Sequence, residues 1–367
     1  TDKDNNSLYE ISIGSENGSV EANTNGSGMF AYLDNVSTLD LSGLDTSNMT
    51  SMSKMFYKST SLTNIDTSGF DTSKVVNMNG MFTGCTNLKT LDVSNFKTSK
   101  VTDMNNMFED CSSLTTLDLS NFDTSNVLYM GNPYSYGYGG MFRNCSSLIN
   151  LNISSFNTSK VKYMSNMFHG CSSLVTLDLS NFDTSNVTAM ASMFGKCTSL
   201  KNLNLSSFNT SKVTDMDSMF MNCKSLADLN LSSFNTSSVQ TFKQMFFNCS
   251  SLVNLDLSGF DTSNAISMWH MFSGSSNLET LDLSNFTTSK LETTYFMFYN
   301  CSKLKTIYVS NEWVTTSLKT SSGMFTNCSS LIGTSPEGIT TKYDSTKIDA
   351  TMANYTTGYL TYKKNTN

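Results

Sequence analysis

The dipeptide Met-Phe recurs twelve times along this chain, and almost every interval between copies is 26 residues. The first copy begins at Met29 and the last at Met324, and only two intervals differ: 34 residues before Met141 and 27 before Met324. A fixed period of this length indicates stacked supersecondary units, each too small to bury its own apolar face. We therefore expect one elongated repeat domain rather than several globular domains.

Each repeat contains two kinds of apolar pattern. In the repeat at Ser99–Phe122, the sequence Leu117-Asp118-Leu119 alternates between apolar and polar residues, which predicts a short strand with Asp118 facing outward. The preceding apolar residues have helical spacing. They are Val101, Met104, Met107, Phe108 and Cys111. The predicted fold class is an α/β repeat, a solenoid of about 12 units with one short parallel β-strand and one short helix or 3₁₀ turn per 26 residues.

The period also predicts the domain boundaries. We expect an N-terminal cap at residues 1–28, the repeats at 29–335, and a C-terminal cap at 336–367, because a stack needs polar outer surfaces at both ends. Ten residues separate Met130 from Met141 where other repeats have two, so an insertion of eight residues lies within 131–140. We expect it to emerge as a loop on one face.

The repeated unit resembles the BspA-like leucine-rich repeat of bacterial surface proteins and mycoplasma-type lipoproteins. The resemblance rests on Met107-Phe108, Cys111-Ser-Ser-Leu114, Leu117-Asp-Leu119-Ser-Asn-Phe122 and Asp-Thr-Ser-Asn-Val127, and it covers about residues 29–335. It implies a right-handed, leucine-rich-repeat-type solenoid in an extracellular protein of the bacterial cell surface, often one linked to adhesion. In the better-known leucine-rich consensus, Phe122 would be the asparagine of a hydrogen-bonded ladder. A spine of phenylalanines is expected here instead.

The nine cysteines share one position, three residues after the Phe of Met-Phe. A buried structural column of free thiols is the favoured interpretation, with disulfides second and a metal site third, because zinc needs clustered ligands and a linear column lacks them. Ser59 and Ser275 occupy the same position in other repeats, so a thiol is not essential there. The column comprises Cys85, Cys111, Cys145, Cys171, Cys197, Cys223, Cys249, Cys301 and Cys328.

The outward position of the predicted strands carries a row of aspartates. Two interpretations stay open: solvated charges that set strand register, or a polar strip that binds a partner or a cation. The candidate binding residues in this row are Asp92, Asp118, Asp178, Asp256 and Asp282, in a series that also includes Asp40 and Asp66.

The insertion is the feature that most favours binding. It reads Gly-Asn-Pro-Tyr-Ser-Tyr-Gly-Tyr-Gly-Gly, and Tyr, Ser and Gly together are typical of adaptable binding loops. The candidate contact residues are Tyr129, Tyr134, Tyr136 and Tyr138. The alternative is a tolerated loop that folds back over an apolar edge.

No catalytic constellation stands out, and we expect neither an enzyme nor a cofactor. The two histidines, His169 and His270, lie at different phases of the repeat and are interpreted as incidental surface substitutions. With charged residues at 14% and a net charge of −7, nucleic acid is an improbable partner, and no apolar run is long enough to insert into a membrane.

These observations predict a cell-surface adhesin or ligand-binding module that displays a repeat surface to a host or neighbouring-cell protein or glycan. The alternative is a passive spacer that presents another domain of a larger surface protein. We expect a monomer, with a signal peptide and an anchor outside residues 1–367.

Overall fold

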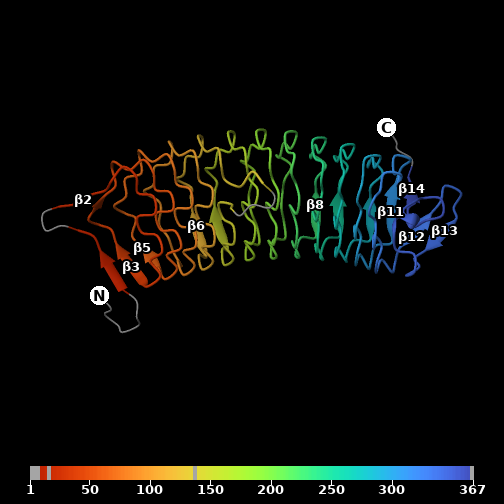
Figure 1. Ribbon diagram of the computed structural model, residues 1–367, viewed down its shortest axis with the longest axis horizontal. Helices are drawn as coiled ribbons and strands as arrows, with labels where there is room; N and C mark the ends of the chain where they lie inside the picture. The colour runs from red at the N-terminus through yellow and green to blue at the C-terminus, as the bar shows by residue number, and fades with distance from the viewer. Residues whose placement is uncertain (1–8, 15–17, 135–138, 364–367) are drawn as a thin grey trace. The chain divides into compact units, whose positions relative to one another are not determined.

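A computed structural model describes residues 9–14, 18–134 and 139–363. The chain divides into two compact units, unit 1 (Thr1–Asn186) and unit 2 (Val187–Asn367). Within each unit, consecutive repeats stack coil on coil, and equivalent residues pair in parallel (Figure 1). The predicted fold class, a parallel-strand solenoid of leucine-rich-repeat type, is confirmed.

The strands of unit 1 are short, and each pairs with a strand in a neighbouring coil. A three-stranded sheet has the order β1-β3-β5, and two further sheets pair β2 with β4 and β6 with β7. In the last pair Leu117 lies opposite Leu151, so the register holds across the insertion. The strands are β1 (Tyr9–Ser12), β2 (Val20–Glu21), β3 (Val36–Asp40), β4 (Leu44–Asp45), β5 (Asn64–Ile65), β6 (Thr116–Asp118) and β7 (Asn150–Asn152).

Unit 2 continues the pattern and ends in a small mixed sheet. β8 pairs with β9 in parallel, and Leu229 lies opposite Leu255. The second sheet has the order β10-β11-β14-β12-β13, with β12 and β13 antiparallel. The elements are β8 (Asp228–Asn230), β9 (Asn254–Asp256), β10 (Thr280–Asp282), β11 (Thr306–Val309), β12 (Ile332–Thr334), β13 (Thr340–Lys342), the 3₁₀ helix η1 (Ala350–Met352) and β14 (Thr361–Tyr362).

The segments around Met-Phe are successive turns, and within the described residues η1 is the only helical element. In the repeat at Met107, the amides of Met107 and Glu109 bond to carbonyls three residues back, whereas the amide of Phe108 bonds to Met141 of the next repeat. Asn106 and Asp110 adopt φ of 63° and 60°, which a right-handed helix excludes. The apolar spacing in the sequence does not reveal that every second amide donates its hydrogen bond to a carbonyl of the next repeat.

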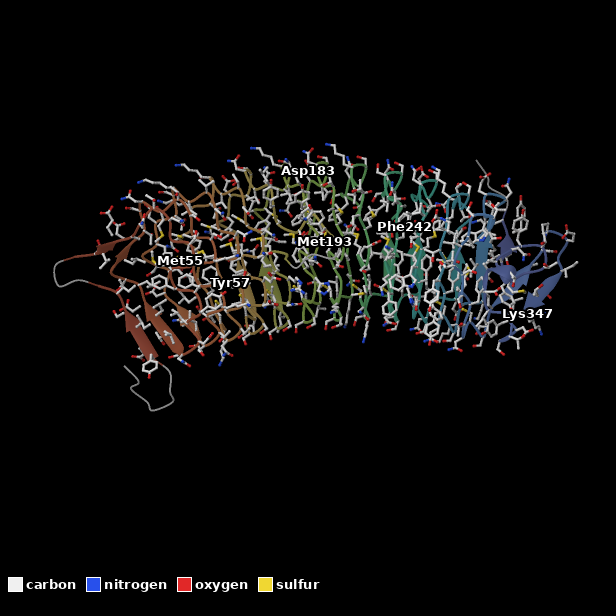
Figure 2. All side chains as sticks on the ribbon, viewed as in Figure 1. Met55, Tyr57, Asp183, Met193, Phe242 and Lys347 are labelled. Carbon is white, nitrogen blue, oxygen red and sulfur yellow. The ribbon has the colours of Figure 1, made fainter. Side chains whose placement is uncertain are left out.

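Phenylalanine rings form the centre of both units. The rings of the Met-Phe pairs stack with centroids 5.4–5.8 Å apart from Phe30 to Phe168 in unit 1, and 5.5–5.7 Å apart from Phe194 to Phe325 in unit 2. Stacked rings contribute beyond the area they bury, so each coil is stabilised by its neighbours. From Met55 (labelled in Figure 2) onward, the methionines of these pairs are fully buried, whereas Met29 of the first pair is exposed.

A second phenylalanine column stands beside the first. Its neighbouring centroids are 6.3–6.5 Å apart in the stacked series Phe70-Phe96-Phe122, Phe156-Phe182 and Phe208-Phe234-Phe260-Phe286. The buried threonine that follows each of these rings by two residues connects the backbones of adjacent coils. Thr98 Oγ1, for example, donates to the carbonyl of Asp123 at 3.0 Å.

The tail packs on the last repeat of unit 2. The ring of Tyr359, fully buried, meets Phe325 edge to face at 5.4 Å. Trp313 Nε1 donates to the carbonyl of Ala353 at 3.2 Å. We propose on this basis that residues 336–367 act as the C-terminal cap, since they cover the final ring of the column.

Candidate ligand-binding surface

The aspartate row of unit 1 lies in a groove of about 1070 Å³ along the outward side of the strands. We call it the strand-face groove. Of the sequence-predicted candidates, the structure brings Asp92, Asp118 and Asp178 together here, with Asp66 at one end. All four are exposed. The lining residues are 64–68, 90–95, 116–118, 120–121, 149–152 and 176–178.

Each of these carboxylates also caps the turn that follows its strand. The amides of Ser94, Ser120 and Ser180 donate to Asp92, Asp118 and Asp178 respectively, each at 2.9 Å. Those backbone hydrogen bonds, with help from the serine hydroxyls, hold the pKa of all three aspartates below its usual range. The row therefore stays ionised in mildly acidic as well as neutral solution.

In other repeats an asparagine caps the same turn. Asn152 and Asn230 accept the amide of the serine two residues later, at 3.3 and 2.9 Å. The turn therefore needs a side-chain carbonyl oxygen, whereas the charge is a separate property of the aspartates. The sequence held the signal for this, because a serine follows the Asp or Asn by two residues in these repeats.

The two remaining aspartate candidates belong to unit 2. Asp256 lies at the end of β9 and is exposed, and its Oδ1 accepts the Ser258 amide at 2.9 Å. Asp282 at the end of β10 is less accessible and forms an ion pair with Lys363. Burial opposes ionisation of Asp282, but hydrogen bonds from Lys363 and Ser284 outweigh it, so its pKa is lowered. Asp282 therefore already has a partner within the chain.

The four candidate tyrosines, Tyr129 before the insertion and three within it, do not share one environment. Tyr129 is half-buried, and its ring stacks on Tyr163 at 5.5 Å and 13°. Tyr134 is 72% exposed. Tyr136 and Tyr138 lie outside the described residues. Thus Tyr129 sits in the repeat stack, and Tyr134 is the described tyrosine most available to a partner.

Antiparallel bridges hold the base of the insertion to the repeats. Gly131 pairs with Gly140, and Asn132 pairs with Ser165 of the following repeat. A Cβ on Gly140 would lie 2.2 Å from the carbonyl oxygen of Asn166, so only glycine permits this approach. No described insertion residue lines the strand-face groove. The two predicted contact regions are thus separate in the described part of unit 1.

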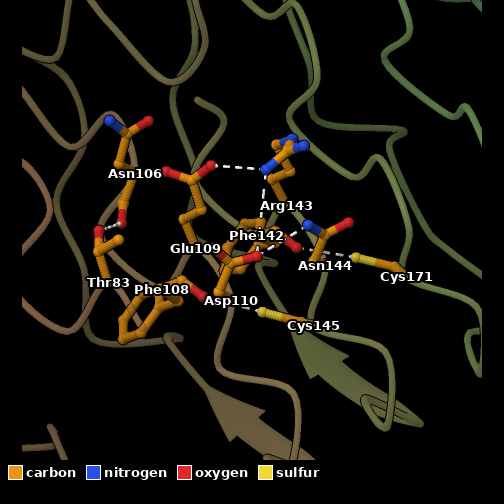
Figure 3. A network of polar contacts seen from close by, with 10 residues as sticks. All are labelled: Thr83, Asn106, Phe108, Glu109, Asp110, Phe142, Arg143, Asn144, Cys145 and Cys171. Atoms are coloured by element: carbon orange, nitrogen blue, oxygen red, sulfur yellow. Dashed lines mark hydrogen bonds and ion pairs between the residues drawn. The ribbon is translucent and has the colours of Figure 1, made fainter. Parts of the chain in front are cut away.

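A charged cluster beside the insertion was not predicted from the sequence (Figure 3). Arg143, the only arginine in the chain, donates from Nη1 to Glu109 Oε1 at 2.9 Å, and the same nitrogen lies 4.0 Å from Asp110 Oδ1. Asn144 Nδ2 donates to Asp110 Oδ1 at 2.7 Å. Burial raises the pKa of Glu109, and the hydrogen bond from Arg143 opposes that rise. A unique arginine two residues after Met141 was the available signal.

The cysteine sulfurs are free and buried, and they share a hydrogen-bonding role. Cys145 Sγ, for instance, donates to the carbonyl of Phe108 at 3.1 Å, and Ser59 and Ser275 donate their hydroxyls to the equivalent carbonyls (Figure 3). Burial raises the pKa of the Cys85, Cys249 and Cys328 thiols to about 12. The position thus accommodates a small donor that reaches a backbone oxygen, which explains why Cys and Ser interchange.

The histidines differ from the surface substitutions that we expected. His169 is buried, at 7% exposure. His270 lies among aromatic rings of unit 2. Across residues 9–14, 18–134 and 139–363, no group of three or more His, Cys, Asp or Glu side chains is arranged to hold a metal ion. Nor does the described part of the chain contain a helix long and apolar enough to cross a bilayer.

Solved structures with similar folds are repeat proteins of low sequence identity. A leucine-rich repeat protein from Bacteroides ovatus is 17% identical, with 82% of this chain and 86% of that one covered and a TM-score of 0.41. A leucine-rich repeat protein from Leptospira interrogans is 17% identical (79% and 74% covered, TM-score 0.28). An internalin from Listeria monocytogenes is 14% identical (86% and 80% covered, TM-score 0.23). No curated protein matches the chain.

A family model matches this chain three times, at residues 24–139, 137–252 and 226–335. Its description is "Mycoplasma protein of unknown function, DUF285". The predicted resemblance to BspA-like, mycoplasma-type leucine-rich repeats is confirmed by this match. Because the matched segments span most of the sequence, the chain belongs to the DUF285 family.

Proposed function

We propose that this chain is the ligand-binding module of a bacterial cell-surface adhesin, and that the strand-face groove of unit 1 receives the partner. The observation that carries the proposal is a continuous groove of about 1070 Å³ with a row of exposed carboxylates along it. Concave surfaces on which several polar groups converge are common places for a partner to bind.

The chemistry of the groove favours a partner protein with basic side chains. Asp92, Asp118 and Asp178 keep a lowered pKa, so they present negative charge along the groove. Thr116, Asn150 and Thr176 add hydrogen-bonding groups between them. A carboxylate row of this kind attracts Lys and Arg and speeds association at low salt. Tyr134 of the insertion provides a second, separate contact.

Asparagine substitution separates charge from fold in a direct test. The triple variant Asp92→Asn, Asp118→Asn, Asp178→Asn keeps every turn cap, as Asn152 does in the native chain. The purified chain would be probed on an array of extracellular-matrix proteins and glycans. We expect binding to a protein that weakens with salt and falls at least about tenfold in the triple variant.

A matched control uses aspartates that cap turns outside the groove. Asp71, Asp123 and Asp183 accept the amides of Ser73, Ser125 and Ser185 at 2.9, 3.0 and 2.9 Å, and none lines the groove. Their triple Asn variant should bind like the parent chain. Equal losses in both variants, or no binding by the parent chain to any protein on the array, would favour the spacer function.

A further inference from the structure

Three consecutive repeats of unit 2 carry an aromatic cluster that the aspartate groove does not involve. We call it the ring cluster. Trp269 and Tyr295 lie two residues before a Met-Phe pair, where unit 1 has Ser53, Asn79 and Ser165. His270 and Phe296 lie one residue before a pair, and Phe247 and Tyr299 lie directly after one. The ring cluster comprises Phe247, Trp269, His270, Tyr295, Phe296 and Tyr299.

His270 is the centre of the cluster. Its ring lies 5.7 Å from Phe247, 5.1 Å from Trp269, 6.0 Å from Tyr295 and 5.2 Å from Phe296, measured between centroids. The contacts with Phe247, Trp269 and Tyr295 are edge to face, which is a favoured aromatic geometry. The rings therefore pack around His270, and Tyr295 remains 36% exposed.

The backbone beneath the cluster is strained by the residues that it carries. His270 and Phe296 have φ of 55° and 51°, a conformation that bulky side chains rarely adopt. Equivalent positions hold Gly80, Asn106 and Gly323, which tolerate positive φ. The Phe296 ring also lies directly over Gly323, where a Cβ would be 2.1 Å from its Cε1. The same positive φ recurs at this position in other repeats, including Lys54 and Gln244, so the two repeats of the cluster are distinguished by the aromatic side chains that they carry there.

Polar groups lie among the rings, and two of them lack a partner. Ser273 occupies the position between Phe247 and Tyr299 in the stack, is 1% exposed, and its Oγ forms no hydrogen bond within the described structure. The buried Nδ1 of His270 likewise forms no hydrogen bond within the described structure. Buried polar atoms are nearly always paired, so these two atoms are places where a water or a hydroxyl group that enters the cluster would gain a hydrogen bond.

Amide side chains border the cluster on one side. Asn248 and Asn300 each follow a ring residue directly, and Gly274 stands between them in the repeat stack. Asn248 donates to Asn222 Oδ1 at 3.2 Å, and Asn300 Oδ1 accepts from Asn327 at 2.7 Å, so the row of amides is interrupted at Gly274. Aromatic faces beside amides and hydroxyls combine an apolar surface with orienting hydrogen bonds.

We propose that the ring cluster of unit 2 is a carbohydrate-binding site, in which a pyranose ring packs on Trp269 and Tyr295 and its hydroxyls bond to the bordering polar groups. A sugar ring has one apolar face and a rim of hydroxyls, and this matches the arrangement. With a net charge of −7, the chain favours a neutral glycan over an acidic one. The site is independent of the strand-face groove.

Tryptophan emission provides the test. The chain has two tryptophans, and Trp313 is buried and bonded to Ala353, so a sugar-dependent change reports Trp269. The probes are cellohexaose, maltohexaose, mannohexaose and N-acetylchitohexaose, each titrated into the full chain. We expect a saturable change with at least one of them, and affinity at least about tenfold weaker in Tyr295→Ser. Trp269→Ser, measured by calorimetry, should abolish binding.

The control variants separate this site from the groove. Tyr57→Ser removes a ring in unit 1 at the repeat position that Phe247 and Tyr299 hold in the ring cluster; Tyr57 contacts Tyr32 edge to face, and the variant should leave sugar binding unchanged. The groove variant Asp92→Asn, Asp118→Asn, Asp178→Asn should also retain it. The assignment would be overturned by an unchanged tryptophan emission with all four sugars, by parent-like affinity in Trp269→Ser, or by an equal loss of affinity in Tyr57→Ser. Capture of a protein partner by the cluster without any sugar response would do the same.

Discussion

Asp217 gives this chain a pH dependence that can be isolated with one substitution. The side chain is 6% exposed, and burial raises its pKa from the ordinary 3.8 to about 6, with the nearby Asp215 adding to the effect. Its Oδ1 accepts the Thr241 hydroxyl at 3.0 Å and the Lys243 amide at 2.9 Å. The amide oxygen of an asparagine side chain would accept both hydrogen bonds without carrying a charge, so Asp217→Asn tests the charge alone.

The sign follows from the two protonation equilibria. A carboxyl with pKa about 6 in the folded chain and 3.8 in the unfolded chain binds its proton more tightly when folded. Its stabilising contribution is therefore complete below pH 3.8 and is lost as the pH rises through about 6. At about 1.4 kcal/mol per pH unit, this amounts to roughly 3 kcal/mol, as an order of magnitude.

The free energy of unfolding, from urea denaturation at pH 4 and pH 8, measures this effect. Asp217→Asn should differ little from the parent chain at pH 4 and be more stable at pH 8, by roughly 3 kcal/mol. Asp178→Asn is the control with opposite sign, because hydrogen bonds hold the pKa of Asp178 low and its charge favours folding at neutral pH. A difference between Asp217→Asn and parent that is the same at both pH values would refute the reasoning.

Three further predictions concern the repeats. Cys223 Sγ donates to the Phe194 carbonyl at 3.1 Å. Cys223→Ser should therefore change the free energy of unfolding by less than about 1 kcal/mol, whereas Cys223→Ala should lower it by about 1–3 kcal/mol. Equal losses for the two variants in urea denaturation would contradict a donor role. Phe220→Ala removes a stacked ring and should cost about 3–5 kcal/mol by the same assay, whereas an unchanged midpoint would mean that the column does not stabilise the coils. Deleting residues 131–138 restores the 26-residue period and should leave the circular dichroism spectrum unchanged, while loss of folded signal would show that the insertion is structural.

The period predicts the architecture because each repeated position becomes a column. The spacing of Phe108 and Phe122 from their copies, together with their apolar character, is sufficient to place both rings in the core. The turns around Met107 were harder to predict, since apolar spacing cannot distinguish a helix from turns that share every second amide with the next coil. Positive φ at Asn106 and Asp110 is the local feature that decides between them.

The candidate sites depend on contacts between repeats that the residue composition does not reveal. Composition drew attention to the Tyr-rich insertion, where Tyr134 is exposed but Tyr129 lies in the stack. It did not reveal the ring cluster, because Phe247 and Tyr295 are 48 residues apart in sequence and come together only when the repeats are in register around His270. Aligning the repeats position by position shows aromatic residues before Met-Phe in two consecutive repeats, at Trp269-His270 and Tyr295-Phe296, where most other repeats have small or polar residues.

The column of buried cysteine sulfurs affects how this protein is damaged by oxidation. While the coils are closed, each thiol holds its proton and is inert to oxidants. When a repeat opens, its cysteine sulfur becomes exposed to solvent. The other cysteines lie in closely similar sequence contexts, so any two exposed sulfurs can form a disulfide with no preferred partner. Under oxidising conditions, a brief opening then becomes a lasting disulfide between two repeats. Resistance to oxidants therefore depends on how rarely the repeats open.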